Sequence, residues 1–119
     1  VEDNELNREI AVELLQMYGI AVEEAENGKI AVERFEKSAP GYYDAILMDI
    51  QMPVMDGYQA TQAIRSLRRA DAGSIPILAL TANAFATDAG KAKNAGMNEH
   101  ITKPINLDIL FTALLKWIV

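Results

Sequence analysis

The stretch YYDAILMDIQMPVMDGYQA, residues 42–60, decides the fold. Its residues Ala45–Met48 are apolar without alternation, which is typical of a parallel strand that helices cover on both faces. The run ends at Asp49, a residue type that is rarely buried without a partner, and a turn with Pro53 and Gly57 follows. The rest of the chain has to explain why an acidic side chain ends a buried strand.

Helical and strand-like patterns alternate along the chain. Apolar residues at helical spacing predict helices over 6–17, 28–35, 56–69, 84–95 and 106–118. Short apolar runs predict further strands over Ile20–Ala25, Ile75–Leu80 and His100–Thr102. This alternation indicates one α/β domain over residues 1–119, with a parallel sheet between two layers of helices. It also requires a strand before the first helix, but the sequence opens at Val1, so we expect that strand to be largely missing.

The composition restricts the classes of function. Half of the 119 residues are apolar and about a quarter are charged, as in an ordinary globular domain. The formal net charge of −6 argues against nucleic-acid binding by this domain and suits a cation or a basic protein partner. No apolar run has the length of a membrane span, so we expect no membrane contact by this domain. The absence of cysteine excludes disulfides and cysteine-ligated zinc and fits a reducing cytosol, which predicts a cytoplasmic location.

Polar residues follow the predicted strands where each strand ends. In open parallel sheets, ligands bind in the crevice beyond the carboxyl ends of the strands. The ends predicted here carry Glu2 and Asp3, Asp49, Thr81, and Lys103. Carboxylates that converge repel one another unless a cation lies among them. A hard divalent cation such as Mg²⁺ suits one or two carboxylates together with backbone oxygen and water.

The same residues fit phosphoryl transfer. Asp49, placed between a cation and Lys103, is a reasonable phosphoryl acceptor, because this reaction depends mostly on positioning and charge neutralisation. Lys103 can pair with Asp49 or with an incoming phosphoryl group. Thr81 can donate a hydrogen bond to a phosphoryl oxygen. The strand ends therefore indicate a site for a cation and a phosphoryl group.

Four motifs in register resemble the response-regulator receiver domain of two-component signalling. They read VEDN, MDIQMPVMDG, LTA and TKP, and their order and spacing match the family over essentially the whole chain. The stretches VEDNELNREIAVELL and LTANAF are most similar to receivers of hybrid sensor histidine kinases. The resemblance implies a flavodoxin-like, doubly wound (βα)5 fold with strand order 2-1-3-4-5.

The resemblance also implies a role for each candidate residue. Asp49 would be the phosphorylated residue, and Glu2 and Asp3 would be the acidic pair at a Mg²⁺ or Mn²⁺ ion. The other implied roles are a metal-binding backbone carbonyl at Gln51, a switch hydroxyl at Thr81, a switch side chain at His100, a phosphoryl-binding Lys103, and structural roles for Pro104 and Gly57. His100 departs from the family, which usually has an aromatic residue such as tyrosine there.

The implied function is that of a phosphoacceptor module rather than an enzyme. Its phosphoryl donor would be the phosphohistidine of a histidine kinase or of a histidine phosphotransfer domain. An output domain or self-association would carry the response. Slow autodephosphorylation would be its only turnover, although a parent protein could contain a histidine kinase.

Other readings of these residues stay open at this point. Asp49 could be a turn residue before Pro53, and Glu2 and Asp3 could simply favour the N-terminus of the first helix. His100 could be a surface histidine.

Two other functions also stay open. One is an aspartate-nucleophile phosphatase, although such enzymes carry a second aspartate where this sequence has Gln51. The other is a degenerate receiver that only binds proteins.

Overall fold

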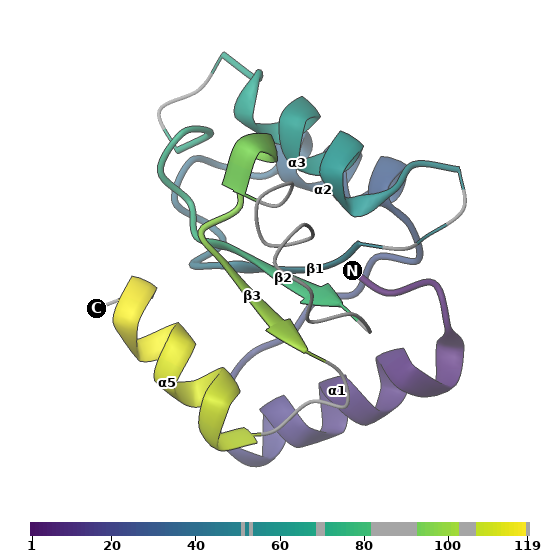
Figure 1. The fold of residues 1–119 in the computed structure, drawn as a ribbon, viewed down its shortest axis with the longest axis vertical. Coiled ribbons are helices and arrows are strands. Elements are labelled where there is room, and N and C mark those ends of the chain that lie inside the picture. The colour runs from purple at the N-terminus through teal and green to yellow at the C-terminus, as the bar shows by residue number, and fades with distance from the viewer. Residues whose placement is uncertain (51, 53, 69–70, 82–92, 103–106, 119) are drawn as a thin grey trace.

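The computed structural model describes the chain except residues 51, 53, 69–70, 82–92, 103–106 and 119. Its described strands are β1 (Ile46–Asp49), β2 (Ile77–Thr81) and β3 (Glu99–Thr102). They form a parallel sheet in the order β1-β2-β3, which lies between two layers of helices (Figure 1). The predicted α/β architecture with a parallel sheet is therefore confirmed.

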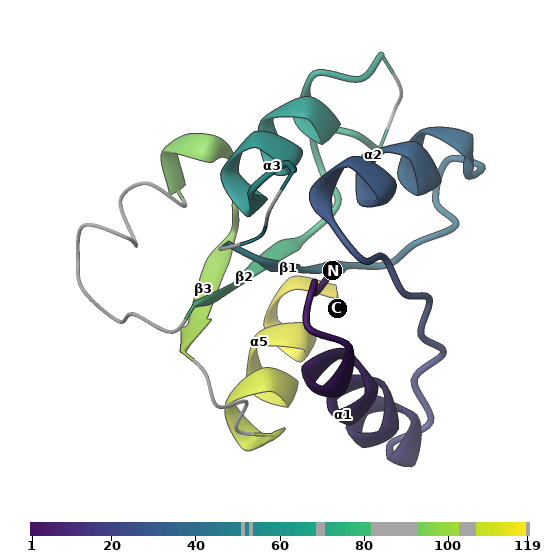
Figure 2. The same ribbon diagram turned by 90° about the vertical axis from the view of Figure 1, so that its right-hand side faces the viewer.

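The helices cover both faces of this sheet. Helices α2 (Gly28–Lys37) and α3 (Gly57–Arg65) pack on one face, and α1 (Glu5–Met17) and α5 (Leu107–Ile118) lie on the other (Figure 2). Asn4, Asn27 and Asp56 each cap a helix with a side chain that accepts a backbone N–H bond. These N-cap residues set the positions at which α1, α2 and α3 begin.

Each face of the sheet has its own apolar core. On one face, Met48 and Ile77 pack with Phe35 of α2 and Ile64 of α3, and all four side chains are almost completely buried. The core of the other face consists of Leu15, Leu78, Leu80, Ile101, Leu110, Ala113 and Leu114. All five residues of β2 are buried, as expected for a central strand of a doubly covered parallel sheet.

Two predicted elements differ from the structure. The strand predicted over Ile20–Ala25 is absent, and the only backbone hydrogen bond from this segment toward the sheet within the described chain joins Glu2 N to Ala25 O (3.1 Å). A strand needs a neighbour along its length, and this segment has one only at its end. The third helix ends at Arg65, earlier than the predicted 69, with Ser66 as its C-cap. The helix predicted over 84–95 lies mostly outside the described residues.

The first residue of the chain lies in the sheet beside β1. Val1 N donates to Leu47 O (2.6 Å), and Asp49 N donates to Val1 O (3.0 Å). This alternation is the hydrogen-bond pattern of a parallel pair. Val1 therefore occupies a strand position beside β1. The next residue, Glu2, bonds Ala25, so the chain start lies between β1 and the Ile20–Ala25 segment.

No helix in the described ranges combines the length and the apolar character that crossing a membrane requires.

Candidate acidic site at the strand ends

Asp49 and Thr81 end two neighbouring strands on the same edge of the sheet. Asp49 is the last residue of β1 and lies opposite Leu80 of β2, so Thr81 follows one position further on. The two residues are 4% and 2% exposed. The register of two apolar strands thus brings a carboxyl group and a hydroxyl group to one edge of the sheet.

Three carboxylates converge at this edge. Ligand oxygens of Glu2, Asp3 and Asp49 all lie within 4.8 Å of one another. Glu2 and Asp49 are buried, whereas Asp3 is exposed. Buried acidic groups this close repel when ionised, and a cation among them removes the repulsion. All the donors are hard oxygens, which is the donor set that Mg²⁺ prefers.

The chain start is held in place by bonds on both of its sides. Val1 pairs with β1, and Glu2 N donates to Ala25 O. From α1, Arg8 Nη1 donates to the backbone oxygen of Glu2 (2.9 Å) while Arg8 Nε donates to Glu24 Oε1 (3.2 Å). Nothing in the sequence indicates this role for Arg8, because Arg8 belongs to no motif and only the fold brings it to Glu2. Arg8 is a positioning residue for the acidic cluster.

Gly57 packs directly against the backbone of Asp49. A Cβ added to Gly57 would lie 2.4 Å from Asp49 O and 2.8 Å from Ile50 Cα, so no side chain fits there. Gly57 N also donates to Ile50 O (2.9 Å). Helix α3 therefore approaches the end of β1 closely at Gly57, where only a glycine fits without a shift of the backbone.

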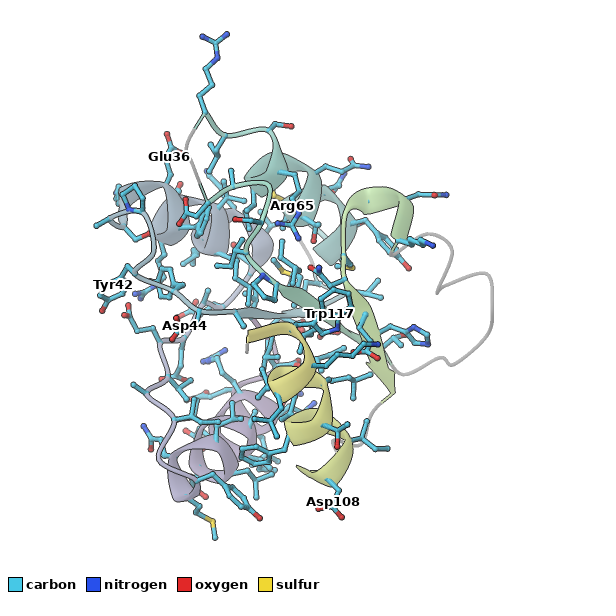
Figure 3. The ribbon with its side chains drawn as sticks, turned by 90° about the vertical axis from the view of Figure 1, so that its left-hand side faces the viewer. Glu36, Tyr42, Asp44, Arg65, Asp108 and Trp117 are labelled. Carbon is cyan, nitrogen blue, oxygen red and sulfur yellow. The ribbon has the colours of Figure 1, made fainter. Side chains whose placement is uncertain are left out.

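A second polar cluster holds β3 next to α3. Arg65 donates three bonds of 3.0 Å each, from Nε to Gly96 O, from Nη1 to Ala72 O and from Nη2 to Asn98 Oδ1. Figure 3 shows Arg65 on α3 beside the start of β3. Partial burial lowers the pKa of Arg65 from its ordinary value. The guanidinium fixes the turn that leads into β3.

The remaining predicted residues are only partly placed by the structure. His100 lies in β3 opposite Ala79, is partly exposed, and is two residues from the strand end. Thr102 ends β3, so Lys103 follows the third strand end in sequence, but Lys103 and Pro104 lie outside the described residues. Gln51 also lies outside them.

Comparisons with known proteins agree with this architecture. The model of the response regulator receiver domain family matches residues 1–115. The chain is 39% identical over 115 residues to hybrid signal transduction histidine kinase I of Dictyostelium discoideum, and 41% identical over 118 residues to the sensor protein GacS of Pseudomonas syringae pv. syringae. These matches cover 95% and 98% of the chain but only 7% and 13% of the two relatives.

Solved structures with a similar fold include a receiver domain and a chemotaxis protein. The receiver domain of sensor histidine kinase PA1611 from Pseudomonas aeruginosa PAO1, which has a magnesium ion coordinated in its active site cleft, superposes with a TM-score of 0.88 at 40% identity, covering 99% of this chain and 93% of that one. The chemotaxis protein CheY4 of Vibrio cholerae gives a TM-score of 0.86 at 28% identity, with 98% and 92% covered. The chain belongs to the response regulator receiver domain family, the phosphoacceptor modules of two-component signalling.

Proposed function

We propose that Asp49 accepts a phosphoryl group from the phosphohistidine of a histidine kinase or of a histidine phosphotransfer domain. The observation that carries the proposal is the convergence of Asp49, Glu2 and Asp3 at the edge of a parallel sheet. A carboxylate oxygen of Asp49 forms a bond to phosphorus while the phosphorus–nitrogen bond breaks. The electron pair of that bond stays on the imidazole nitrogen, which takes up a proton, and the product is an aspartyl phosphate.

The three carboxylates fit a divalent cation. Glu2, Asp3 and Asp49 would hold Mg²⁺ or Mn²⁺, together with the backbone carbonyl of Gln51. The bound cation would neutralise negative charge on the phosphoryl oxygens. The positions of Glu2 and Asp3 depend on the bonds of Val1, Glu2 and Arg8 described above.

Thr81 and His100 are proposed to convert phosphorylation into a change of surface. The buried Thr81 hydroxyl would donate a hydrogen bond to a phosphoryl oxygen, and Lys103 would pair with another. His100, on the neighbouring strand, would rearrange with Thr81 and alter the surface around β3 and α5. An output domain or a second copy of the chain would read that change. Water would hydrolyse the aspartyl phosphate slowly, so turnover stays minor.

Intact-mass measurement after incubation with acetyl phosphate and Mg²⁺ tests the proposal. We expect the chain to gain one phosphoryl group and the Asp49→Asn variant to gain none. Asp44→Asn is the matched control, because Asp44 is exposed and lies at the opposite end of the run that contains β1 (Figure 3). Rapid hydrolysis of small phosphomonoesters would instead indicate a phosphatase, and an absence of modification with any donor would indicate a receiver that only binds proteins.

A further inference from the structure

Val54 has an unusual backbone conformation in the loop that follows Asp49. Among the residues that the structure describes, it is the only one other than glycine with a positive φ, at 71°. Left-handed conformations are uncommon for side chains other than asparagine and aspartate, and a β-branched residue is an outlier there. Strain of this kind persists only where the surrounding structure imposes it, and strained residues cluster at functional sites.

The side chain of Val54 contributes no packing that offsets this strain. Val54 is 78% exposed, which is the largest value among the exposed large apolar residues of the described chain. It also belongs to neither apolar core of the sheet. Asparagine or glycine would suit this backbone better and would lose no buried surface. The stability of the domain therefore does not account for a valine at position 54.

The described residues on both sides of Val54 are held in place. Met52 is buried in the core of the α2 and α3 face, and Met55 packs against the same core. Asp56 begins α3 with a capping box, which fixes the end of the loop. These contacts impose the backbone conformation of Val54 and keep its side chain outside the core.

The loop that carries Val54 begins and ends at the acidic site. Ile50 directly follows Asp49, and Gly57 N donates to Ile50 O (2.9 Å), so residues 50–57 form a loop that is closed at its base. Gly57 also lies against the carbonyl of Asp49. A protein that brings a reactive group to Asp49 therefore covers this loop, whereas a small phosphoryl donor reaches the carboxylate without needing the loop.

We propose that Val54 is a recognition residue for the protein that donates the phosphoryl group, and that it packs against apolar side chains beside the phosphohistidine of that protein. This inference rests on the proposed function of Asp49. The strained loop holds Val54 in position before the donor arrives, so little conformational entropy is lost on binding. Apolar surface that is exposed in the free chain becomes buried in the complex, which stabilises the complex.

The donor that we infer is a histidine kinase whose own receiver domain is similar to this chain. Sensor histidine kinase PA1611 is such a protein, because its receiver domain is 40% identical to this chain. We therefore choose PA1611 without its receiver domain, autophosphorylated with radiolabelled ATP, as the protein donor. Acetyl phosphate with Mg²⁺ is the small donor, which has no surface to place against Val54.

Transfer from the two donors to the same chain tests the proposal. We expect Val54→Asn to raise the chain concentration that gives half-maximal transfer from PA1611 by about tenfold, because the buried apolar contact is lost. The maximal rate of that transfer should stay unchanged. Phosphorylation by acetyl phosphate should proceed at the rate of the parent chain.

Two further variants and a stability measurement control the experiment. Val54→Leu keeps an apolar side chain and should keep most of the affinity for PA1611. Met17→Asn should change neither reaction, because Met17 is equally exposed, at 77%, but lies at the end of α1 opposite the acidic cluster. In urea denaturation, Val54→Asn should have an unfolding equilibrium constant about fivefold lower than the parent, because backbone strain is relieved.

Four outcomes would overturn the proposal. Equal losses with both donors would show that Val54 acts on the acceptor site and not on recognition of the donor. An unchanged half-maximal concentration, or no transfer from PA1611 to a parent chain that acetyl phosphate labels, would show that the donor does not bind through this loop. Reduced stability of Val54→Asn would assign the side chain to the fold. Failure of the proposed function gives a different result, because neither donor then labels the parent chain at Asp49.

Discussion

Asp49 is a buried acidic residue at the end of an apolar strand, and its neighbours account for it. The side chain lies where β1 ends, and its carboxylate is close to those of Glu2 and Asp3, which belong to the first residues of the chain. The apolar residues of β1 fix its backbone, and Gly57 lies against the carbonyl of Asp49. A carboxyl group held this tightly is suited to a reaction that depends on position.

Gly57 provides a direct test of that positioning. We expect Gly57→Ala to lower the free energy of unfolding by about 2 kcal/mol or more, because the added methyl group overlaps the Asp49 carbonyl and Ile50. Urea denaturation measures the loss. Gly73→Ala is the control, since nothing lies within 4 Å of a Cβ there and that variant should keep the stability of the parent. Equal effects of the two substitutions would contradict the close approach.

The strands illustrate what can be inferred from sequence and what requires the fold. The unbroken apolar runs correctly indicated β1 and β2, since a doubly covered strand leaves a clear signal. The Ile20–Ala25 prediction was wrong for this chain, because residue preference cannot show whether a strand has a neighbour. The contacts of Arg8 and Arg65 could not be predicted from the sequence, since each joins segments that only the fold brings together.

Arg65 joins α3 to the turn before β3, and replacement by lysine tests this link. Lysine keeps the charge but cannot reproduce the fork that reaches Gly96, Ala72 and Asn98. We expect Arg65→Lys to lower the free energy of unfolding by about 1–3 kcal/mol. Thermal or urea unfolding measures the change. Arg68→Lys is the control, and it should change the free energy of unfolding little because Arg68 is exposed. An equal loss of stability in this control would contradict the role assigned to Arg65.

Arg8 connects α1 to the acidic cluster. We expect Arg8→Ala to weaken Mg²⁺ binding by about tenfold, because the Glu2 backbone loses its bond to the guanidinium and the chain start becomes less ordered. Calorimetric titration with Mg²⁺ measures this loss. Arg34→Ala removes an exposed arginine of α2 and should leave the affinity unchanged. An Arg8→Ala variant with the affinity of the parent would contradict the positioning role.

At the scale of the whole molecule, the acidic cluster joins the chain start to the sheet. The charges within this cluster therefore affect the stability of the whole fold. Without a divalent cation, Glu2, Asp3 and Asp49 repel one another at less than 4.8 Å. We expect Mg²⁺ to raise the free energy of unfolding of the parent chain, and that of the Asp49→Asn variant much less, because the variant lacks one of the three carboxylates. Equal responses of both chains in thermal melts would contradict a cation site at Asp49.

The site was more predictable than the complete sheet. Parallel strands place their carboxyl ends at one edge, so Asp49 and Thr81 could be brought together from the order of elements alone. Glu2 and Asp3 followed from the same rule, and the structure places them beside Asp49. Burial of Glu2 and the support from Arg8 could not be inferred, because they depend on the path of the chain start between β1 and Ala25.

The location of the phosphoryl group is the most direct test of the central claim. After incubation with acetyl phosphate and Mg²⁺, borohydride reduces an aspartyl phosphate to homoserine, and peptide mass spectrometry then locates the modified residue. We predict homoserine at position 49 alone, in the peptide that contains Ile46–Asp49. Homoserine at Asp3, Asp44 or Asp56 instead, with Asp49 unmodified, would contradict the account.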